Sequence, residues 1–121
     1  MRIDVKARPP GSFVIITDDM DAEIPEFDTR PHRLWWNEWC IGVGTRADVD
    51  GETVLHIADK WVAPVGELVF DGYIESPHRN VTVSDANLVE YGAVTVMNSK
   101  AHIRVWTNHP REPDEIFIAI E

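Results

Sequence analysis

Apolar and polar residues alternate with a period of two along short stretches of this chain. In residues 2–7, for example, Ile3, Val5 and Ala7 share one side and polar residues occupy the other. Successive side chains of a β-strand point to opposite faces, so this alternation predicts strands with one buried side. Further strands are predicted at residues 12–17, 34–45, 54–58, 67–74, 81–84, 93–97, 101–107 and 115–121.

Turn signals separate these stretches. Pro9-Pro10-Gly11 predicts a turn that joins the first two strands into a hairpin, and Asp48–Gly51 predicts a tight hairpin turn because Asp-Gly tolerates positive φ. Asn98–Lys100 predicts a further hairpin between the strands at 93–97 and 101–107. About eight to ten short strands, at intervals of about ten residues, predict an all-β fold: an antiparallel β-sandwich with little helix.

The same alternation assigns faces within individual strands. Ile103 and Val105 are predicted to face the core, while Trp106 faces outward. In the strand at 67–74, Leu68 and Phe70 are predicted to share one face. Trp106 is therefore a candidate for an exposed aromatic anchor.

Length and charge narrow the functional classes. Residues 1–121 suffice for a single domain, and 44% of them are hydrophobic, which is ordinary for a globular protein. The net charge is −10, from 21 acids and 11 bases. Phosphates and anionic membranes repel such a chain, so nucleic-acid and membrane binding are disfavoured. A basic protein partner is favoured electrostatically, the alternative being that the charge serves only solubility.

Cys40 is the single cysteine, so an intramolecular disulfide is excluded and a reducing, cytoplasmic location is expected. Its apolar surroundings predict a buried thiol with a raised pKa, which would be inert. The N-terminus lacks the apolar stretch of a signal peptide, and no stretch approaches the ~20 apolar residues of a membrane helix.

A long acidic loop is predicted at residues 18–33, where Pro25 and Pro31 disfavour regular structure. A calcium loop of the EF-hand type would need a glycine and a glutamate where Ile24 and Arg30 stand. A solvated loop and an anionic docking surface remain as alternatives. The carboxylates of the docking alternative are Asp18, Asp19, Asp21, Glu23, Glu26 and Asp28.

Three tryptophans, Trp35, Trp36 and Trp39, fall within five residues. On one strand at least one of them must face away from the other two, and an exposed tryptophan suits a protein interface. Core packing and stacking on a small flat ligand are the alternatives. Trp36 and Trp106 are the aromatic residues that we expect at a partner-binding surface.

No catalytic or metal motif stands out in the sequence. The five histidines lack the H-x-H or H-x₃-H spacing of zinc ligands, although His56 and His102, both on predicted strands, could meet in the fold. Phosphate-binding and nucleophile-elbow patterns are also missing. We therefore assign no cofactor, no metal and no catalytic residue, and an enzyme is the less favoured class.

Five stretches of the C-terminal part follow a rhythm of short strands and tight turns: Leu68–Ile74, Val81–Val83, Ala93–Met97, Ala101–Trp106 and Asp114–Ile118. This rhythm resembles the competence protein J-like family of small bacterial β-sandwich proteins, which are nuclease inhibitors. The resemblance covers roughly residues 52–121, with Asn98–Lys100 in place of a Pro-Pro-Gly-type turn. It implies a β-sandwich and an inhibitor or immunity-type binding role, and no functional residue is carried over from it.

Three functional hypotheses follow from these observations. The first is a binding module that occludes a basic protein through the acidic loop and exposed tryptophan. The second is a small-ligand binder or enzyme whose pocket is assembled from distant strands. The third is a homodimer formed by edge pairing through residues 115–121, an apolar strand that would be a risky free edge.

Overall fold

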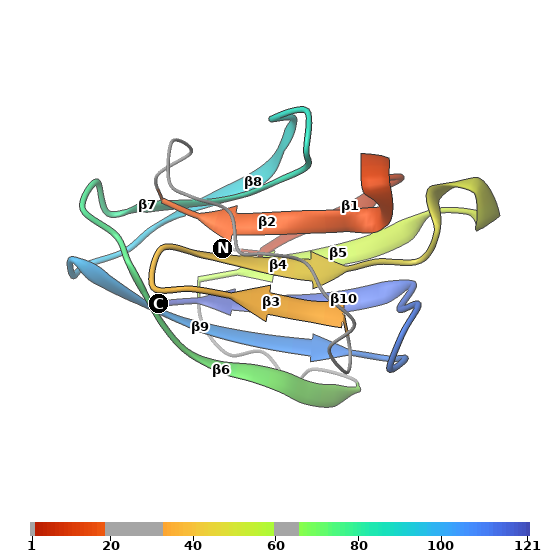
Figure 1. Ribbon diagram of the computed structural model, residues 1–121. Coiled ribbons are helices and arrows are strands. Elements are labelled where there is room, and N and C mark those ends of the chain that lie inside the picture. Colours follow the sequence, from red (N-terminus) through yellow and green to blue (C-terminus); the bar gives the residue numbers. More distant parts are fainter. Residues whose placement is uncertain (1, 19–32, 60–65) are drawn as a thin grey trace.

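The computed structural model describes residues 2–18, 33–59 and 66–121, which form two packed β-sheets (Figure 1). Two short 3₁₀ turns, η1 (Pro10–Ser12) and η3 (Asp48–Asp50), accompany the strands in this part of the chain. No helix there is long and apolar enough to cross a membrane. The ten strands are β1 (Arg2–Ala7), β2 (Phe13–Thr17), β3 (Leu34–Trp36), β4 (Cys40–Gly44), β5 (Thr53–Ala58), β6 (Glu67–Glu75), β7 (Asn80–Ser84), β8 (Glu90–Thr95), β9 (Lys100–Thr107) and β10 (Glu115–Ile120).

Each sheet has five strands. One has the order β1-β5-β10-β9-β6 and is called sheet A below, and the other has the order β3-β4-β2-β7-β8 and is called sheet B. Neighbouring strands run antiparallel, except that β10 runs parallel to β5. The predicted all-β sandwich is confirmed, with one parallel pair that the prediction did not include.

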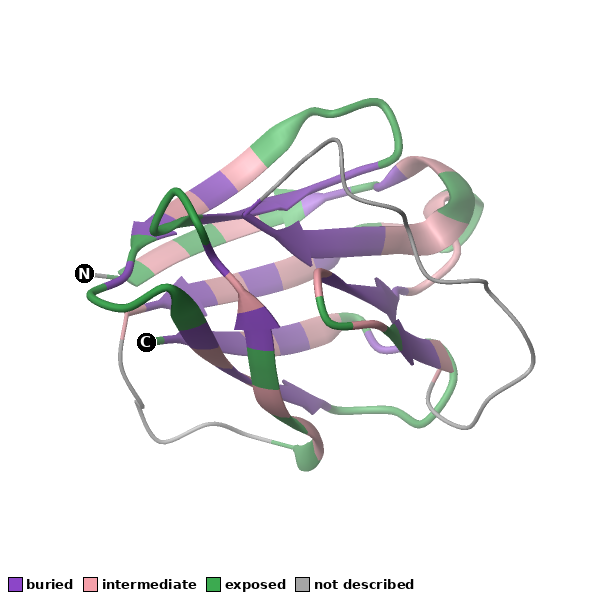
Figure 2. Ribbon diagram, turned by 60° about the vertical axis from the view of Figure 1, so that its left-hand side comes forward, coloured by how far each residue is buried: buried purple, intermediate pink, exposed green. Residues whose placement is uncertain are grey.

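The hydrophobic core lies between the two sheets (Figure 2). Ile16 and Ile41 of sheet B and Leu55, Ile103 and Ile118 of sheet A are at most 1% exposed. Burying an aliphatic side chain of this size contributes about 1.5–3 kcal/mol. The predicted inward positions of Ile103 and Val105 are confirmed, since both are fully buried. Period-two alternation thus builds the core from one face of each strand.

The three predicted hairpins do not form, because the two strands of each do not pair with one another. β1 and β2 belong to different sheets, as do β4 and β5 on either side of η3, and β8 and β9 on either side of Asn98–Lys100. In each case the turn carries the chain across the sandwich instead of back along its own sheet. A Pro, Gly or Asn signal stops a strand in both situations, so it does not specify which sheet receives the next strand.

The stretch at 34–45, predicted as one strand, is a hairpin of β3 and β4. Asn37 breaks it, because its side-chain Oδ1 accepts hydrogen bonds from the backbone N–H groups of Trp39 (2.8 Å) and Cys40 (2.9 Å). The Asn37 N–H in turn donates to the Cys40 carbonyl, at 3.0 Å. Local side-chain bonding of this kind competes with an extended strand.

A register shift between Leu68 and Phe70 marks a β-bulge in β6. Phe70 packs against the core, while Leu68 is 46% exposed. The prediction that these two residues share a face is therefore wrong, because the extra residue of a bulge reverses the alternation.

The C-terminal strand β10 lies in the middle of sheet A, paired with β5 on one side and β9 on the other. Its backbone groups are used within the chain, so residues 115–121 offer no free edge to a second copy. Homodimer formation by edge pairing through this strand is therefore excluded. A strand with apolar residues on both faces can be a central strand as well as an aggregation-prone edge strand. The sequence pattern of residues 115–121 therefore did not distinguish the two positions.

Candidate functional site

The outer face of sheet A carries charged and aromatic side chains in neighbouring positions of its five strands. Alternation turns the isoleucines of β10 inward, and so Glu115 and Phe117 point outward. The register places Asp4, His56, Phe117 and Trp106 in one row across β1, β5, β10 and β9. We call this surface the charged face, and it comprises Arg2, Asp4, His56, Asp71, Tyr73, His102, Arg104, Trp106, Glu115, Phe117 and Glu121.

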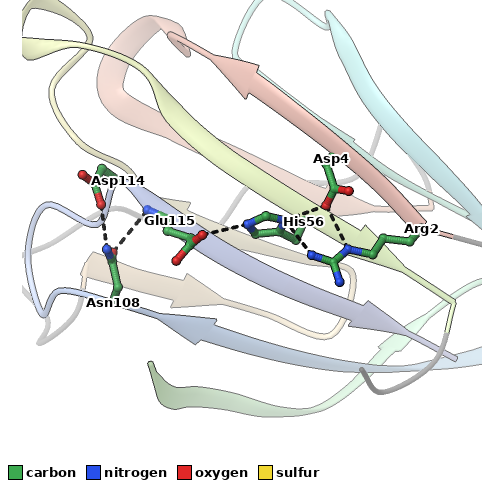
Figure 3. Close-up of polar contacts among 6 residues, drawn as sticks. All are labelled: Arg2, Asp4, His56, Asn108, Asp114 and Glu115. Carbon is green, nitrogen blue, oxygen red and sulfur yellow. Dashed lines mark hydrogen bonds and ion pairs between the residues drawn. The ribbon is translucent and has the colours of Figure 1, made fainter. Parts of the chain in front are cut away.

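His56 lies between two carboxylates of this face (Figure 3). Its Nδ1 is 2.6 Å from Oδ1 of Asp4, and its Nε2 is 3.0 Å from Oε2 of Glu115. Arg2 donates from Nε to the same Asp4 oxygen at 2.9 Å. The hydrogen bond to His56, followed by that from Arg2, holds the pKa of Asp4 below its ordinary value. The imidazole also stacks on the Phe117 ring, with centroids 4.2 Å apart.

Asn108 fixes the chain immediately before Glu115 (Figure 3). Its amide Nδ2 donates to Oδ1 of Asp114 at 2.6 Å, and its Oδ1 accepts from the backbone N–H of Glu115 at 3.2 Å. The loop between β9 and β10 is thereby closed at the entry to β10. This closure helps to hold the Glu115 carboxylate beside His56.

His102 belongs to a separate group on the same face. Its Nε2 is 2.5 Å from Oδ1 of Asp71, and its ring stacks on Tyr73 with centroids 4.7 Å apart. His56 and His102 thus have different partners, and β10 separates their strands. The hypothesis that they converge is not supported by this arrangement.

The carboxylates of the charged face are paired within the chain and do not converge on a metal site or a deep pocket. Asp4 and Glu115 approach opposite ring nitrogens of His56, so they do not face a common ion, and no metal-binding group of three ligands occurs among the described residues. The depression lined by Arg2, His56 and Trp106 has room for little more than a water molecule. A small organic ligand does not fit there.

Trp36 and Trp106 differ in exposure. Trp36, on the edge strand β3, is 48% exposed, and its ring meets Phe70 of β6 edge-on at 5.6 Å. Trp106 was expected to be exposed, but only 8% of its surface is accessible. β9 has a neighbour on each side, so Trp106 is flanked in register by Phe117 and Leu68. The prediction that the Trp106 side chain points outward is confirmed, but the prediction that it is exposed is wrong.

Asp18 is also buried, at 8% exposed. Its Oδ2 accepts a hydrogen bond from the backbone N–H of His78 at 2.7 Å, and its Oδ1 lies 3.6 Å from His78 Nδ1. The carboxylate holds the turn before β7 instead of facing solvent. The prediction that Asp18 belongs to an exposed docking surface is therefore wrong. The other acids of the predicted loop, Asp19, Asp21, Glu23, Glu26 and Asp28, lie outside the described residues.

Cys40 is buried, as its apolar surroundings predicted. It is 1% exposed, and burial raises the pKa of its thiol to about 11. We expect the folded protein to resist iodoacetamide at pH 8, because the thiolate is scarce and shielded. Intact-mass spectrometry should show alkylation only after denaturation in guanidinium, with the denatured chain as the control. Alkylation of the native chain at the denatured rate would contradict the buried position.

The structure of this chain is similar to the crystal structure of ComJ, an inhibitor of the DNA-degrading activity of NucA, from Bacillus subtilis. The TM-score is 0.65 at 8% sequence identity, and the match covers 97% of this chain and 92% of ComJ. No protein-family model and no curated protein matches the sequence. The resemblance predicted from the C-terminal strands is confirmed as a shared fold, and it extends to residues 1–50, where the sequence had shown none.

Sequence reasoning did not find most of the charged face. Arg2, Asp4 and Phe117 stand at outward positions of alternating strands, which is a signal that many solvated residues share. Asp4 and Glu115 meet at His56 only because β1 and β10 both pair with β5. The register between distant strands was the missing information.

Proposed function

We propose that this chain is a protein-binding inhibitor of a cationic DNA-degrading nuclease. The observation that carries the proposal is the similarity to ComJ over almost the whole of both chains. A shared fold does not by itself imply a shared function, so the charge of this chain has to support the same conclusion. Its net charge of −10 does so.

A nuclease that binds DNA must present Lys and Arg to the phosphates, because their contacts supply most of the affinity. A protein surface rich in carboxylates is complementary to such a cleft and is steered toward it over several ångströms. Inhibition would then be occlusion: the bound protein covers the cleft, and its carboxylates pair with the cations that otherwise hold phosphate. No covalent chemistry is required of this chain.

Plasmid degradation by NucA and by a panel of other cationic nucleases tests the proposal. We expect at least one nuclease to be inhibited at a stoichiometry of one to one. An acidic protein of unrelated fold and similar net charge is the control, and it should not inhibit. If no nuclease in the panel is inhibited at low salt, the proposed function is wrong.

The salt dependence of that inhibition is a separate prediction. The association rate, measured by stopped-flow fluorescence, should fall at least about tenfold between 20 and 500 mM NaCl, because exposed charges are screened. The dissociation rate should change much less. An association rate that is independent of salt would contradict electrostatic steering. A gel-shift assay with the protein alone should show no DNA binding, since this acidic chain is repelled by phosphates.

A further inference from the structure

The loop between β7 and β8, residues 85–89, displays two apolar side chains. Leu88 is 65% exposed and Val89 is 52% exposed. Leu88 also has a backbone φ of +65°, in the left-handed region that a branched apolar residue rarely adopts. An exposed leucine in this conformation costs the fold free energy and contributes no core packing in return.

Asp85 closes this loop with hydrogen bonds. It is 3% exposed, and its Oδ1 accepts hydrogen bonds from the backbone N–H groups of Asn87 (2.8 Å) and Val89 (3.1 Å). Its Oδ2 accepts from the Tyr91 hydroxyl at 2.7 Å. The backbone closes the same loop, since Leu88 N–H donates to the Asp85 carbonyl at 3.0 Å. Burial would raise the pKa of Asp85, but these hydrogen bonds outweigh it and hold the pKa below the ordinary value.

None of these bonds uses the Leu88 side chain. An asparagine at this position would adopt the left-handed conformation more easily, so folding gives no reason for leucine. Backbone strain held by its surroundings is frequent at sites of function. A loop closed by several hydrogen bonds also loses less conformational entropy on binding, which favours its exposed residues as anchors.

The charges around the loop indicate what it would meet. β4 and β7 both run antiparallel to β2, so the segments that follow them, η3 and residues 85–89, emerge at the same end of sheet B (Figure 1). Val49 of η3 is 86% exposed there. Asp50 and Glu52 beside it, and Glu90 at the start of β8, are exposed. In the described part of the chain these three carboxylates have no ion-pair or hydrogen-bond partner.

We propose that the 85–89 loop is the anchor by which this chain docks on its nuclease partner, with Leu88 inserted into an apolar pocket at the rim of the cationic cleft. Glu90, Asp50 and Glu52 would then lie opposite Lys and Arg side chains of that rim. We assign a cationic protein as the occupant because Glu90 adjoins the apolar side chains of the loop, and Asp50 and Glu52 flank Val49 at the same end of sheet B. This inference rests on the proposed function and names the surface that performs it.

Two substitutions of Leu88 test the inference with the nuclease that the wild-type protein inhibits. Leu88→Ala removes the anchor, and Leu88→Asn removes it while relaxing the backbone. The inhibition constant should rise at least about 30-fold for both, as for other central apolar anchors. Met97→Ala is the matched control: Met97 is 86% exposed and follows the other end of β8. Its inhibition constant should stay within about twofold of wild type.

Thermal unfolding separates an anchor from a structural residue. Leu88→Asn should melt at the wild-type temperature or a few degrees above it, since strain is relieved and no packing is lost. A large drop in melting temperature would show that the side chain stabilises the fold, and the anchor role would be wrong. The same holds if both Leu88 variants inhibit like wild type, although the proposed function would then stand. If the wild-type protein inhibits no nuclease, the proposed function and this inference fall together.

Self-association through the loop is the remaining alternative. Light scattering of the wild type and of Leu88→Ala distinguishes it. A monomer in both cases is the expected result. A wild-type dimer that Leu88→Ala dissociates would show that a second copy of this chain covers the loop, and would overturn the proposal.

Discussion

Replacing Asp85 with alanine is expected to lower the free energy of unfolding by about 3 kcal/mol. The substitution removes an acceptor that is 3% exposed and that takes hydrogen bonds from the Tyr91 hydroxyl and from the N–H groups of Asn87 and Val89. A hydrogen bond to a charged acceptor contributes about 1.5–3 kcal/mol, and water replaces part of this at Asn87 and Val89, which are exposed. Urea denaturation followed by tryptophan fluorescence measures the change. A loss below about 0.5 kcal/mol would show that water replaces the carboxylate at no cost.

Asp85→Asn provides the matched test of the charge. The pKa of Asp85 is lower in the folded protein than its ordinary value, so its ionised form is stabilised by folding. That contribution is present above the unfolded pKa, near 4, and is lost as the pH falls through the folded pKa. The stability gap between wild type and Asp85→Asn should therefore be constant near pH 7 and shrink below about pH 4. A gap that widens as the pH falls would contradict the direction of the shift.

Gly66→Ala is expected to cost at least about 3 kcal/mol of stability or to prevent folding. Gly66 precedes β6 with a φ of +108°, which side-chain-bearing residues rarely adopt. A Cβ at this position would also collide with the carbonyl group of Thr107 and approach the backbone nitrogen of Asn108. Backbone atoms at the end of β9 cannot move aside without breaking the β6–β9 pairing. Both effects act together, so the loss should exceed that of an ordinary surface substitution.

Gly92→Ala is the control for this prediction. A Cβ there would meet the Cδ1 atoms of Ile57 and Ile3, the far ends of flexible side chains that can shift. We expect a cost of about 1 kcal/mol or less, by thermal unfolding under the same conditions. Equal losses for Gly66→Ala and Gly92→Ala would show that the strained backbone at Gly66 is not what limits substitution.

The charged face and the surface around the 85–89 loop differ in how much charge is free to pair with a partner. On the charged face, Asp4, Glu115 and Asp71 have their own histidine or arginine partners, so little of its charge is left for another molecule. Near the 85–89 loop, by contrast, the carboxylates of Asp50, Glu52 and Glu90 are exposed and have no partner in the described part of the chain, and the side chains of Leu88 and Val89 project into solvent. We therefore expect substitutions at the loop to change inhibition, and those on the charged face to change mainly stability.

Local pattern in the sequence was enough for the position and inward face of many strands. Ile103, Val105 and the isoleucines of β10 alternate with outward residues, and this period of two is a property of the extended backbone alone. The all-β class, the buried thiol of Cys40 and the likeness to a β-sandwich inhibitor all follow from such local information. Each is correct in the structure.

Only the tertiary structure decided which strands pair and what each loop displays. β1 joins β5 and not β2, and β10 lies parallel to β5, because pairing depends on backbone bonds and packing between residues far apart in sequence. His56 meets Asp4 and Glu115 for the same reason. In the sequence, nothing distinguishes Leu88 from any other apolar residue that precedes a strand. Its exposure and its left-handed backbone result from the bonds that Asp85 makes across the loop, and no period-two pattern contains them.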